Sequence, residues 1–191
     1  MKLRATLCAI VLLAAGCATT WTVRSTPSAI ALQWPFQPAQ AKLTFVESLD
    51  GFSERKGSGE ALRAFVYGRD SGQRSAFILP VAVSRGNDGR IAVADLGRRC
   101  VHLYIPAEKR YVRITGGKKD VLISPVGVVF DEALRLYVSD SAGKLFGFDP
   151  QGVQRFSVVR AAAEPFLRPT GLAYSPARKL VYVVDTLANR V

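Results

Sequence analysis

The sequence of 191 residues is strongly basic, with a formal net charge of +11, and it contains one histidine and three cysteines. A single histidine excludes a three-histidine zinc site unless further ligands come from outside this sequence. The excess of positive charge is typical of proteins that meet nucleic acid, anionic lipid, cell-wall polymer or an acidic protein. A basic surface with no dedicated partner has the same composition.

The N-terminus has the pattern of a secretory signal at 1–16. A short basic start with Lys2 and Arg4 precedes an uncharged apolar stretch and then small residues. The apolar stretch is about a dozen residues long, short of the roughly 20 that span a bilayer. Its end, LAAGC, resembles the lipobox of bacterial lipoproteins, which implies cleavage before Cys17 and acylation of that residue. An ordinary signal peptide cut near Ala18 is the alternative.

This signal predicts export, with a lipidated N-terminus that holds the protein on a membrane of the cell envelope. Ala18 resembles the residue that follows the cysteine in lipoproteins sorted to the outer membrane, so we expect the periplasmic face of that membrane where a bacterium has two. Cys8 leaves with the signal and Cys17 is acylated, so Cys100 has no partner for a disulfide. We expect Cys100 to be a buried apolar residue and His102 to lie on the polar face of a strand.

The next part of the chain precedes the repeats. Residues 17–41 are rich in proline and lack a sustained hydrophobic period, which predicts an extended tether. Alternation in KLTFVESL predicts a strand at 42–49. Glycine and charge dominate 50–76, where apolar residues at helical spacing allow one short helix at 59–67. From Phe77 onward, short apolar runs alternate with polar turns, as in all-β proteins.

Two markers repeat in the rest of the chain. The first is an aspartate that recurs at intervals of 45 residues: Asp95, Asp140 and Asp185. The second is a proline that recurs at intervals of 45 and 44 residues: Pro80, Pro125 and Pro169. In each unit the proline opens a first strand, a polar turn follows, a second strand ends at the aspartate, and a third strand begins soon after. Fourth strands are predicted at 111–115 and 154–159, and four strands in about 45 residues match one propeller blade.

The fold class predicted is therefore all-β: an incomplete β-propeller of four-stranded blades, with about two and a half blades present. The blades are expected at 78–115 and 123–159, with a partial blade at 167–191. Because one blade cannot cover both apolar faces of its own sheet, it must stack on its copies. Six such blades need about 270 residues, so we expect a C-terminally truncated propeller. Within 42–76, the first strand would be the one that closes the last blade.

The repeat resembles the NHL family of six-bladed propellers. The resemblance rests on a proline, a glycine two residues later, a Tyr-Val-x-Asp strand and a loop that ends in Asn-x-Arg-Val or a similar sequence. These elements stand at PVGV 125–128 with YVSD 137–140, and at PTGL 169–172 with YVVD 182–185 and NRV 189–191. The first unit departs from the pattern, because Ala82 replaces the glycine and Ala92 replaces the tyrosine.

The repeated aspartates are predicted to be structural, because a catalytic residue is needed once and not once per blade. We expect each to accept hydrogen bonds from backbone N–H groups of the loop that follows it, as in Asx turns. In propellers the loops after the second and fourth strands lie on one face, and here they carry many cations. The candidate ligand-binding residues are Arg98, Arg99, Lys118, Lys119, Lys144, Arg168 and Arg190. Such a face suits an anionic ligand or an acidic partner, although the turns opposite are basic as well.

These features predict a lipid-anchored, non-catalytic binding or scaffold module, with no cofactor and no metal, for a protein or anionic ligand of the envelope. The alternative is an enzyme, since some similar propellers are metal-dependent lyases or lactonases. The first strands of these blades offer no histidine or carboxylate to a central metal, so catalytic residues would lie mostly in blades absent from this sequence. Nucleic-acid binding, which occurs in some NHL domains, is disfavoured by the export signal.

Overall fold

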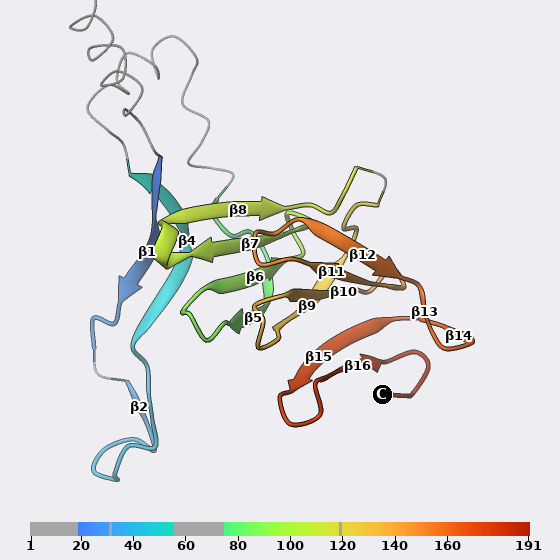
Figure 1. Ribbon diagram of the computed structural model, residues 1–191. Coiled ribbons are helices and arrows are strands. Elements are labelled where there is room, and N and C mark those ends of the chain that lie inside the picture. Colours follow the sequence, from blue (N-terminus) through green and yellow to red (C-terminus); the bar gives the residue numbers. More distant parts are fainter. Residues whose placement is uncertain (1–18, 31, 56–74, 119) are drawn as a thin grey trace, which may run out of the picture.

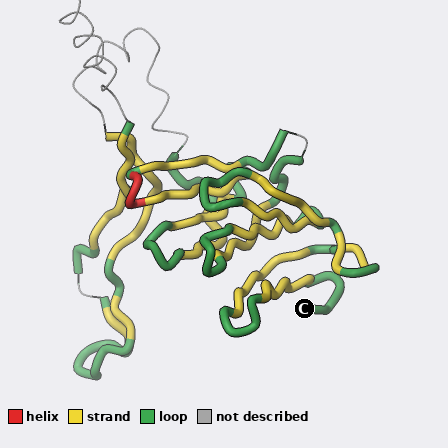
Figure 2. The backbone as a smooth tube through the Cα atoms, viewed as in Figure 1, coloured by secondary structure: helices red, strands yellow, loops and turns green. Residues whose placement is uncertain are grey.

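The computed structural model describes residues 19–30, 32–55, 75–118 and 120–191. The signal at 1–16, Cys17, the candidate helix at 59–67 and Lys119 lie outside these ranges. The described chain is almost wholly β-structure (Figure 1), and Figure 2 shows helix in it only at the 3-10 turn η1 (Pro106–Glu108). None of its described helical residues forms a helix of the length and hydrophobicity that crossing a membrane requires.

Two four-stranded antiparallel sheets and part of a third form the repeated portion (Figure 1). Blade 1 consists of β5 (Pro80–Arg85), β6 (Ile91–Asp95), β7 (Cys100–Ile105) and β8 (Arg110–Ile114). Blade 2 consists of β9 (Pro125–Phe130), β10 (Leu136–Asp140), β11 (Lys144–Phe148) and β12 (Gln154–Val158). Blade 3 has β15 (Pro169–Ser175) and β16 (Leu180–Asp185), after a small hairpin of β13 (Arg160–Ala161) and β14 (Glu164–Pro165). The prediction of an incomplete propeller is confirmed.

Blades 1 and 2 stack and share one hydrophobic core. Strand β5 lies beside β9, and β9 in turn lies beside β15. The core draws on both blades and on the loop between them: Ala92, Ala94, Val101, Leu103, Ile105, Ile114, Leu122, Val128, Phe130, Leu136, Val138, Phe146 and Phe148. Apolar surface that a lone blade would leave in water is thus buried between neighbours, as the stacking of repeats requires.

Blade 3 approaches blade 2 closely at a glycine. The Ser139 hydroxyl donates a hydrogen bond to the carbonyl oxygen of Thr170. A Cβ on Gly127 would lie 2.5 Å from the Ser139 Oγ and closer still to that carbonyl. Only glycine fits at this position of β9, which accounts for the glycine two residues after the proline in this unit.

The N-terminal segment forms a two-stranded antiparallel ribbon, β1 (Thr20–Pro27) with β4 (Glu47–Arg55). Its distal end continues into β2 (Gln33–Trp34) and β3 (Leu43–Thr44), which project away from the blades (Figure 1). The structure thus differs from the tether expected at 17–41, because β1 has a full pairing partner in β4. The strand expected at 42–49 is interrupted between β3 and β4.

The ribbon attaches to blade 1 through aromatic side chains. Phe52, buried at 1 % exposure, lies 5.2 Å from Tyr104 and 5.3 Å from Tyr111 between ring centroids. The Trp21 ring lies 4.7 Å from Tyr111, and the Trp21 N–H donates to the carbonyl of Lys109 at 2.7 Å. Blade 1 is therefore covered on one side by blade 2 and at its outer strands by the ribbon.

Candidate functional site

The two repeat markers meet in space. Each proline that opens a blade is the register partner of the aspartate that ends the second strand: Pro80 with Asp95, Pro125 with Asp140, and Pro169 with Asp185. In blade 2 the carboxylate of Asp140 accepts hydrogen bonds from the backbone N–H of Ile123 at 2.6 Å and of Ser124 at 3.0 Å. These are the two residues just before the proline. We call this arrangement the aspartate clip.

The clip recurs in the other blades. Asp95 accepts from the N–H groups of the two residues before Pro80 at 2.8 and 3.0 Å, and Asp185 accepts likewise before Pro169 at 3.0 and 2.7 Å. The loop that follows supplies only one further backbone donor each to Asp95 and Asp140, from Arg98 and Ala142. Sequence reasoning placed the donors in that loop, whereas two of them for each aspartate come from the residues before the proline. The constant spacing from proline to aspartate was the signal that could have identified the others.

The clip lowers the pKa of its aspartate in blades 1 and 3. Burial of Asp95 acts to raise its pKa, but the N–H groups of Ile78, Leu79 and Arg98 outweigh burial and hold the pKa below its usual value. In Asp185 the same balance lowers the pKa, with the guanidinium of Arg190 assisting. Charged at neutral pH and occupied by backbone donors, the carboxylates of Asp95 and Asp185 hold the entry to blades 1 and 3.

A buried polar cluster lies next to the clip of blade 1. His102 is fully buried, its Nδ1 lies 2.8 Å from the Tyr111 hydroxyl, and its Nε2 lies 3.4 Å from the Asp95 carboxylate and 3.5 Å from the Cys100 Sγ. His102 was expected on the polar face of a strand, but both faces of β7 are buried and the imidazole lies among buried side chains. The expected burial of Cys100 is confirmed. Every residue of β7 is buried, so alternation along it marks no exposed face.

The cluster has the residue types of a thiol nucleophile site but not its environment. Burial raises the pKa of the Cys100 thiol and lowers that of His102 to about 4, so both groups are neutral at pH 7. Phe77, at 5.0 Å between ring centroids, and Phe52 lie against the imidazole. Across the described ranges, no group of three or more His, Cys, Asp and Glu side chains is arranged to hold a metal ion.

The candidate cations of the loop face divide into two groups. Lys144 forms an ion pair with Asp120 at 2.5 Å, and Arg190 lies 3.3 Å from Asp185. Arg98 is half-buried, and its Nε donates to the carbonyl oxygen of Ala76. Three of the predicted cations are exposed instead: Arg99, Lys118 and Arg168. Of the described members of the predicted set, three therefore face solvent and three make contacts within the fold, and Lys119 lies outside the described residues.

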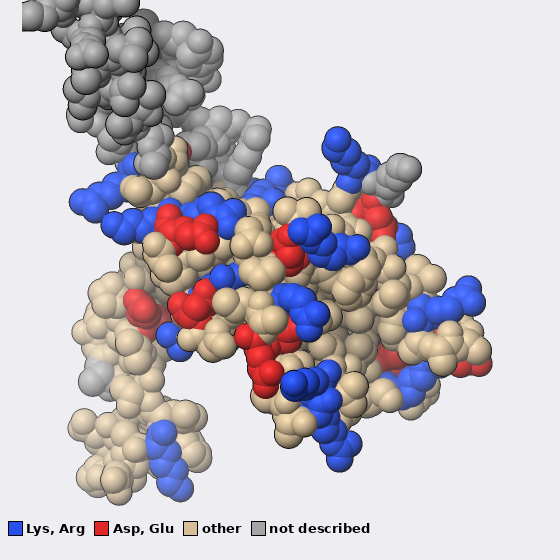
Figure 3. All heavy atoms as spheres, viewed as in Figure 1, with Lys and Arg blue, Asp and Glu red and all other residues tan. Residues whose placement is uncertain are grey.

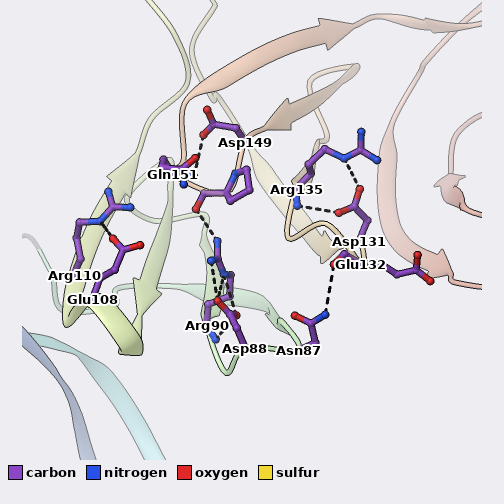
Figure 4. Close-up of polar contacts among 11 residues, drawn as sticks. Asn87, Asp88, Arg90, Glu108, Arg110, Asp131, Glu132, Arg135, Asp149 and Gln151 are labelled. Atoms are coloured by element: carbon purple, nitrogen blue, oxygen red, sulfur yellow. Dashed lines mark hydrogen bonds and ion pairs between the residues drawn. The ribbon is translucent and has the colours of Figure 1, made fainter.

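The opposite turns hold several of their cations in ion pairs (Figure 4). Arg90 is buried, pairs with Asp88 at 2.8 Å and donates from Nη1 to the Pro150 carbonyl at 2.6 Å, which ties blade 1 to blade 2. Arg135 pairs with Asp131 at 2.6 Å. Three other cations on this side are exposed: Arg85, Arg178 and Lys179. On the face shown in Figure 3, basic and acidic side chains are intermixed over the blades.

No family model matches the sequence, and no curated protein does. Solved structures similar to this one include propeller-like proteins. Hydrazine synthase from Kuenenia stuttgartiensis matches with a TM-score of 0.45 and 16 % identity, over 59 % of this chain and 34 % of that chain. A luciferin-regenerating enzyme matches with a TM-score of 0.43 and 18 % identity, over 58 % and 38 %. U3-55K matches with a TM-score of 0.40 and 14 % identity, over 55 % and 30 %. The chain thus spans about a third of the length of each.

Proposed function

We propose that this protein is a non-catalytic binding module of the NHL propeller type, attached by lipid at Cys17 to a membrane of the bacterial cell envelope. Its partner would be an acidic protein or another anionic component of the envelope. The observation that supports the proposal is the difference in exposure between the acidic and the basic side chains of the repeat. The repeated aspartates are buried and occupied by backbone donors, whereas Arg99, Lys118 and Arg168 remain exposed on the loops.

The positive charge of these loops determines which class of partner they would bind. Exposed guanidinium and ammonium groups attract an anionic partner and raise its rate of encounter, and this attraction weakens as salt is added. The buried cluster of Asp95, Cys100 and His102 does not compete with this interpretation, because its side chains are not accessible to a substrate.

Binding can be tested with poly-L-glutamate as a mimic of an acidic protein. The variant Arg99→Glu/Lys118→Glu/Arg168→Glu should bind at least about tenfold more weakly than the parent, since three exposed charge contacts together contribute about 1.5 kcal/mol. The matched control reverses the exposed cations of the opposite turns: Arg85, Arg178 and Lys179. Equal loss in both variants would show that only the overall net charge attracts the probe, which would overturn a loop-face site.

Attachment to the membrane is tested separately in a bacterial host. The parent should fractionate with membranes and carry the mass of a diacylated N-terminal cysteine, and Cys17→Ser should release it to the soluble envelope fraction. An unmodified N-terminus in the parent would contradict the lipoprotein assignment and leave the loop-face proposal standing.

A further inference from the structure

The end of the ribbon has an unusual surface. We call residues 32–46, which hold β2, β3 and the loop between them, the arm. Its large apolar side chains face solvent: Leu32, Trp34, Phe36, Leu43, Phe45 and Val46. Trp34 and Phe36 near its tip are exposed at 58 % and 73 %. The remaining exposed Trp or Phe ring among the described residues, Phe156, lies on blade 2, so exposed aromatic surface is concentrated in the arm.

The arm is a built hairpin with its own hydrogen bonds. The Lys42 N–H donates to the Trp34 carbonyl at 2.9 Å, and the Ala39 N–H donates to the Phe36 carbonyl at 3.2 Å. The Gln33 side-chain amide donates to the carbonyls of Pro35 and Ala39 at 3.1 and 3.0 Å. Pro35 and Pro38 have no N–H to satisfy. Much of the backbone polarity of the tip is therefore satisfied internally, which lowers the cost of moving it out of water.

Charge on the arm has one sign. The sequence from 32 to 46 contains no acidic residue, and Lys42 is its one charged side chain. In Figure 3 the arm is tan with a single basic patch, while the blades show both signs. Tryptophan and phenylalanine beside lysine, without a carboxylate, form the combination that favours the boundary between lipid headgroups and acyl chains.

We propose that the arm inserts its tip, with Trp34 and Phe36, into the interface of an anionic lipid bilayer, with Lys42 at the headgroups. The arm projects away from the blades (Figure 1), so the tip can enter the interface without a collision of the propeller with the membrane. This contact would exist without an acyl chain on Cys17. It therefore stands or falls separately from the lipoprotein assignment.

A lipid surface fits the arm better than a second copy of the chain does. A copy would bring a surface on which Asp and Glu alternate with Lys and Arg (Figure 3), and the arm offers Lys42 alone to pair with such charges. Binding to an anionic bilayer requires only apolar and aromatic surface at the tip of the arm and positive charge next to it. Self-association through the arm is therefore the competing outcome of the test.

The test uses the chain from residue 17 onward with Cys17→Ser, so that no acyl chain contributes. Its binding to phosphatidylglycerol-containing vesicles is measured by cosedimentation and by tryptophan emission. We expect binding with a blue shift that disappears in Trp34→Phe, since Trp21 is packed on Tyr111. Trp34→Ser/Phe36→Ser should weaken partitioning by at least about tenfold, as expected for withdrawal of two large apolar side chains.

Two control variants distinguish binding through the arm from binding through exposed apolar side chains elsewhere or through net positive charge. Leu180→Ser/Leu187→Ser removes side chains exposed at 52 % and 61 % on blade 3 and should bind as the parent does. Lys42→Gln should weaken binding to anionic vesicles by about fivefold and leave binding to phosphatidylcholine unchanged.

Absence of vesicle binding by the parent would overturn the proposal, and so would equal losses in the two serine pairs. Sedimentation velocity without lipid supplies the remaining outcome. Dimers that the arm variant abolishes would reassign the arm to a contact between copies of the chain.

Discussion

In each blade, the carboxylate of one aspartate holds the backbone of the segment before the first strand. Burial of an ionised carboxylate is unfavourable unless its oxygens accept hydrogen bonds, and Asp140 is 1 % exposed with donors from Ile123, Ser124 and Ala142. The donors come from both sides of the aspartate in the sequence. One side chain thereby fixes the start of the first strand and the turn after the second.

The substitution Asp140→Asn tests this role. An amide nitrogen presents hydrogens where the carboxylate presents an acceptor, so at least one backbone N–H loses its partner in a buried site. We expect the free energy of unfolding to fall by about 1–3 kcal/mol, measured by urea denaturation. Asp120→Asn, which removes the partner of Lys144 at the surface, should cost less than about 1 kcal/mol. Similar losses in both would mean that the clip contributes no more than a surface ion pair.

His102 makes stability depend on pH in a defined direction. Its pKa is about 4 in the folded protein, chiefly because of burial, against 6.5 as the ordinary value. The unfolded chain therefore binds a proton first as pH falls, and the stability contributed by neutral His102 is lost between pH 6.5 and 4. The loss reaches about 3 kcal/mol near pH 4. Denaturation midpoints across this range measure it.

The substitution His102→Gln provides the control for this pH dependence. Glutamine is neutral throughout and can bond the Tyr111 hydroxyl, so its stability should be nearly flat from pH 6.5 to about 5. The chain has one histidine, and the carboxylate of Asp95, with its lowered pKa, titrates at lower pH. An unchanged slope in this variant would exclude His102 as the source.

At the scale of strands, whether the repeat position requires glycine depends on the atoms that a Cβ there would contact. Gly127 and Gly171 occupy the same position, two residues after the proline of their units. A methyl group on Gly127 would collide with the Thr170 carbonyl, whereas one on Gly171 would meet the Val184 side chain at 3.4 Å, an ordinary contact. The two glycines are a matched pair for mutation.

We expect Gly127→Ala to destabilise the protein by about 1–3 kcal/mol, because blade 3 must move away from blade 2 to admit the methyl group. Gly171→Ala should be neutral or stabilising by up to about 1 kcal/mol, through the lower entropy of the unfolded chain. Thermal and urea unfolding of both variants supply the comparison. Equal effects would show that the repeat glycine is required for its backbone conformation and not for the approach of the next blade.

The strands of the blades could be predicted from sequence, whereas the ribbon could not. Pro80, Pro125 and Pro169 with their aspartates are local in sequence and recur, so their spacing sets the period of the blades. The pairing of β1 with β4 joins segments that a proline-rich loop separates. No turn motif between them predicts this pairing. His102 was misplaced for a related reason: a strand covered on both faces has no polar alternation to reveal them.

At the scale of the whole molecule, an aromatic contact and a few backbone hydrogen bonds, among them that of the Trp21 N–H with the Lys109 carbonyl, join the ribbon to the blades. Phe52 links them, since it comes from β4 and lies against Tyr104 and Tyr111 of blade 1. The same contact closes the buried cluster around His102. Release of the ribbon would therefore expose both the aromatic surface and the histidine, so ribbon docking and the neutral state of His102 stabilise each other.

The substitution Phe52→Ala should separate the ribbon from blade 1. Loss of a buried phenylalanine costs about 3–5 kcal/mol. The amides of β1 and β4 should exchange with solvent faster than those of β10, because Leu136 and Val138 of β10 lie in the core that blades 1 and 2 share. Hydrogen exchange by mass spectrometry measures this difference. Phe45→Ala, at an arm residue exposed at 44 %, should change stability by less than about 1 kcal/mol. If exchange rises equally in ribbon and blades, the ribbon is part of a single cooperative unit, and the aromatic contact does not mark a boundary within it.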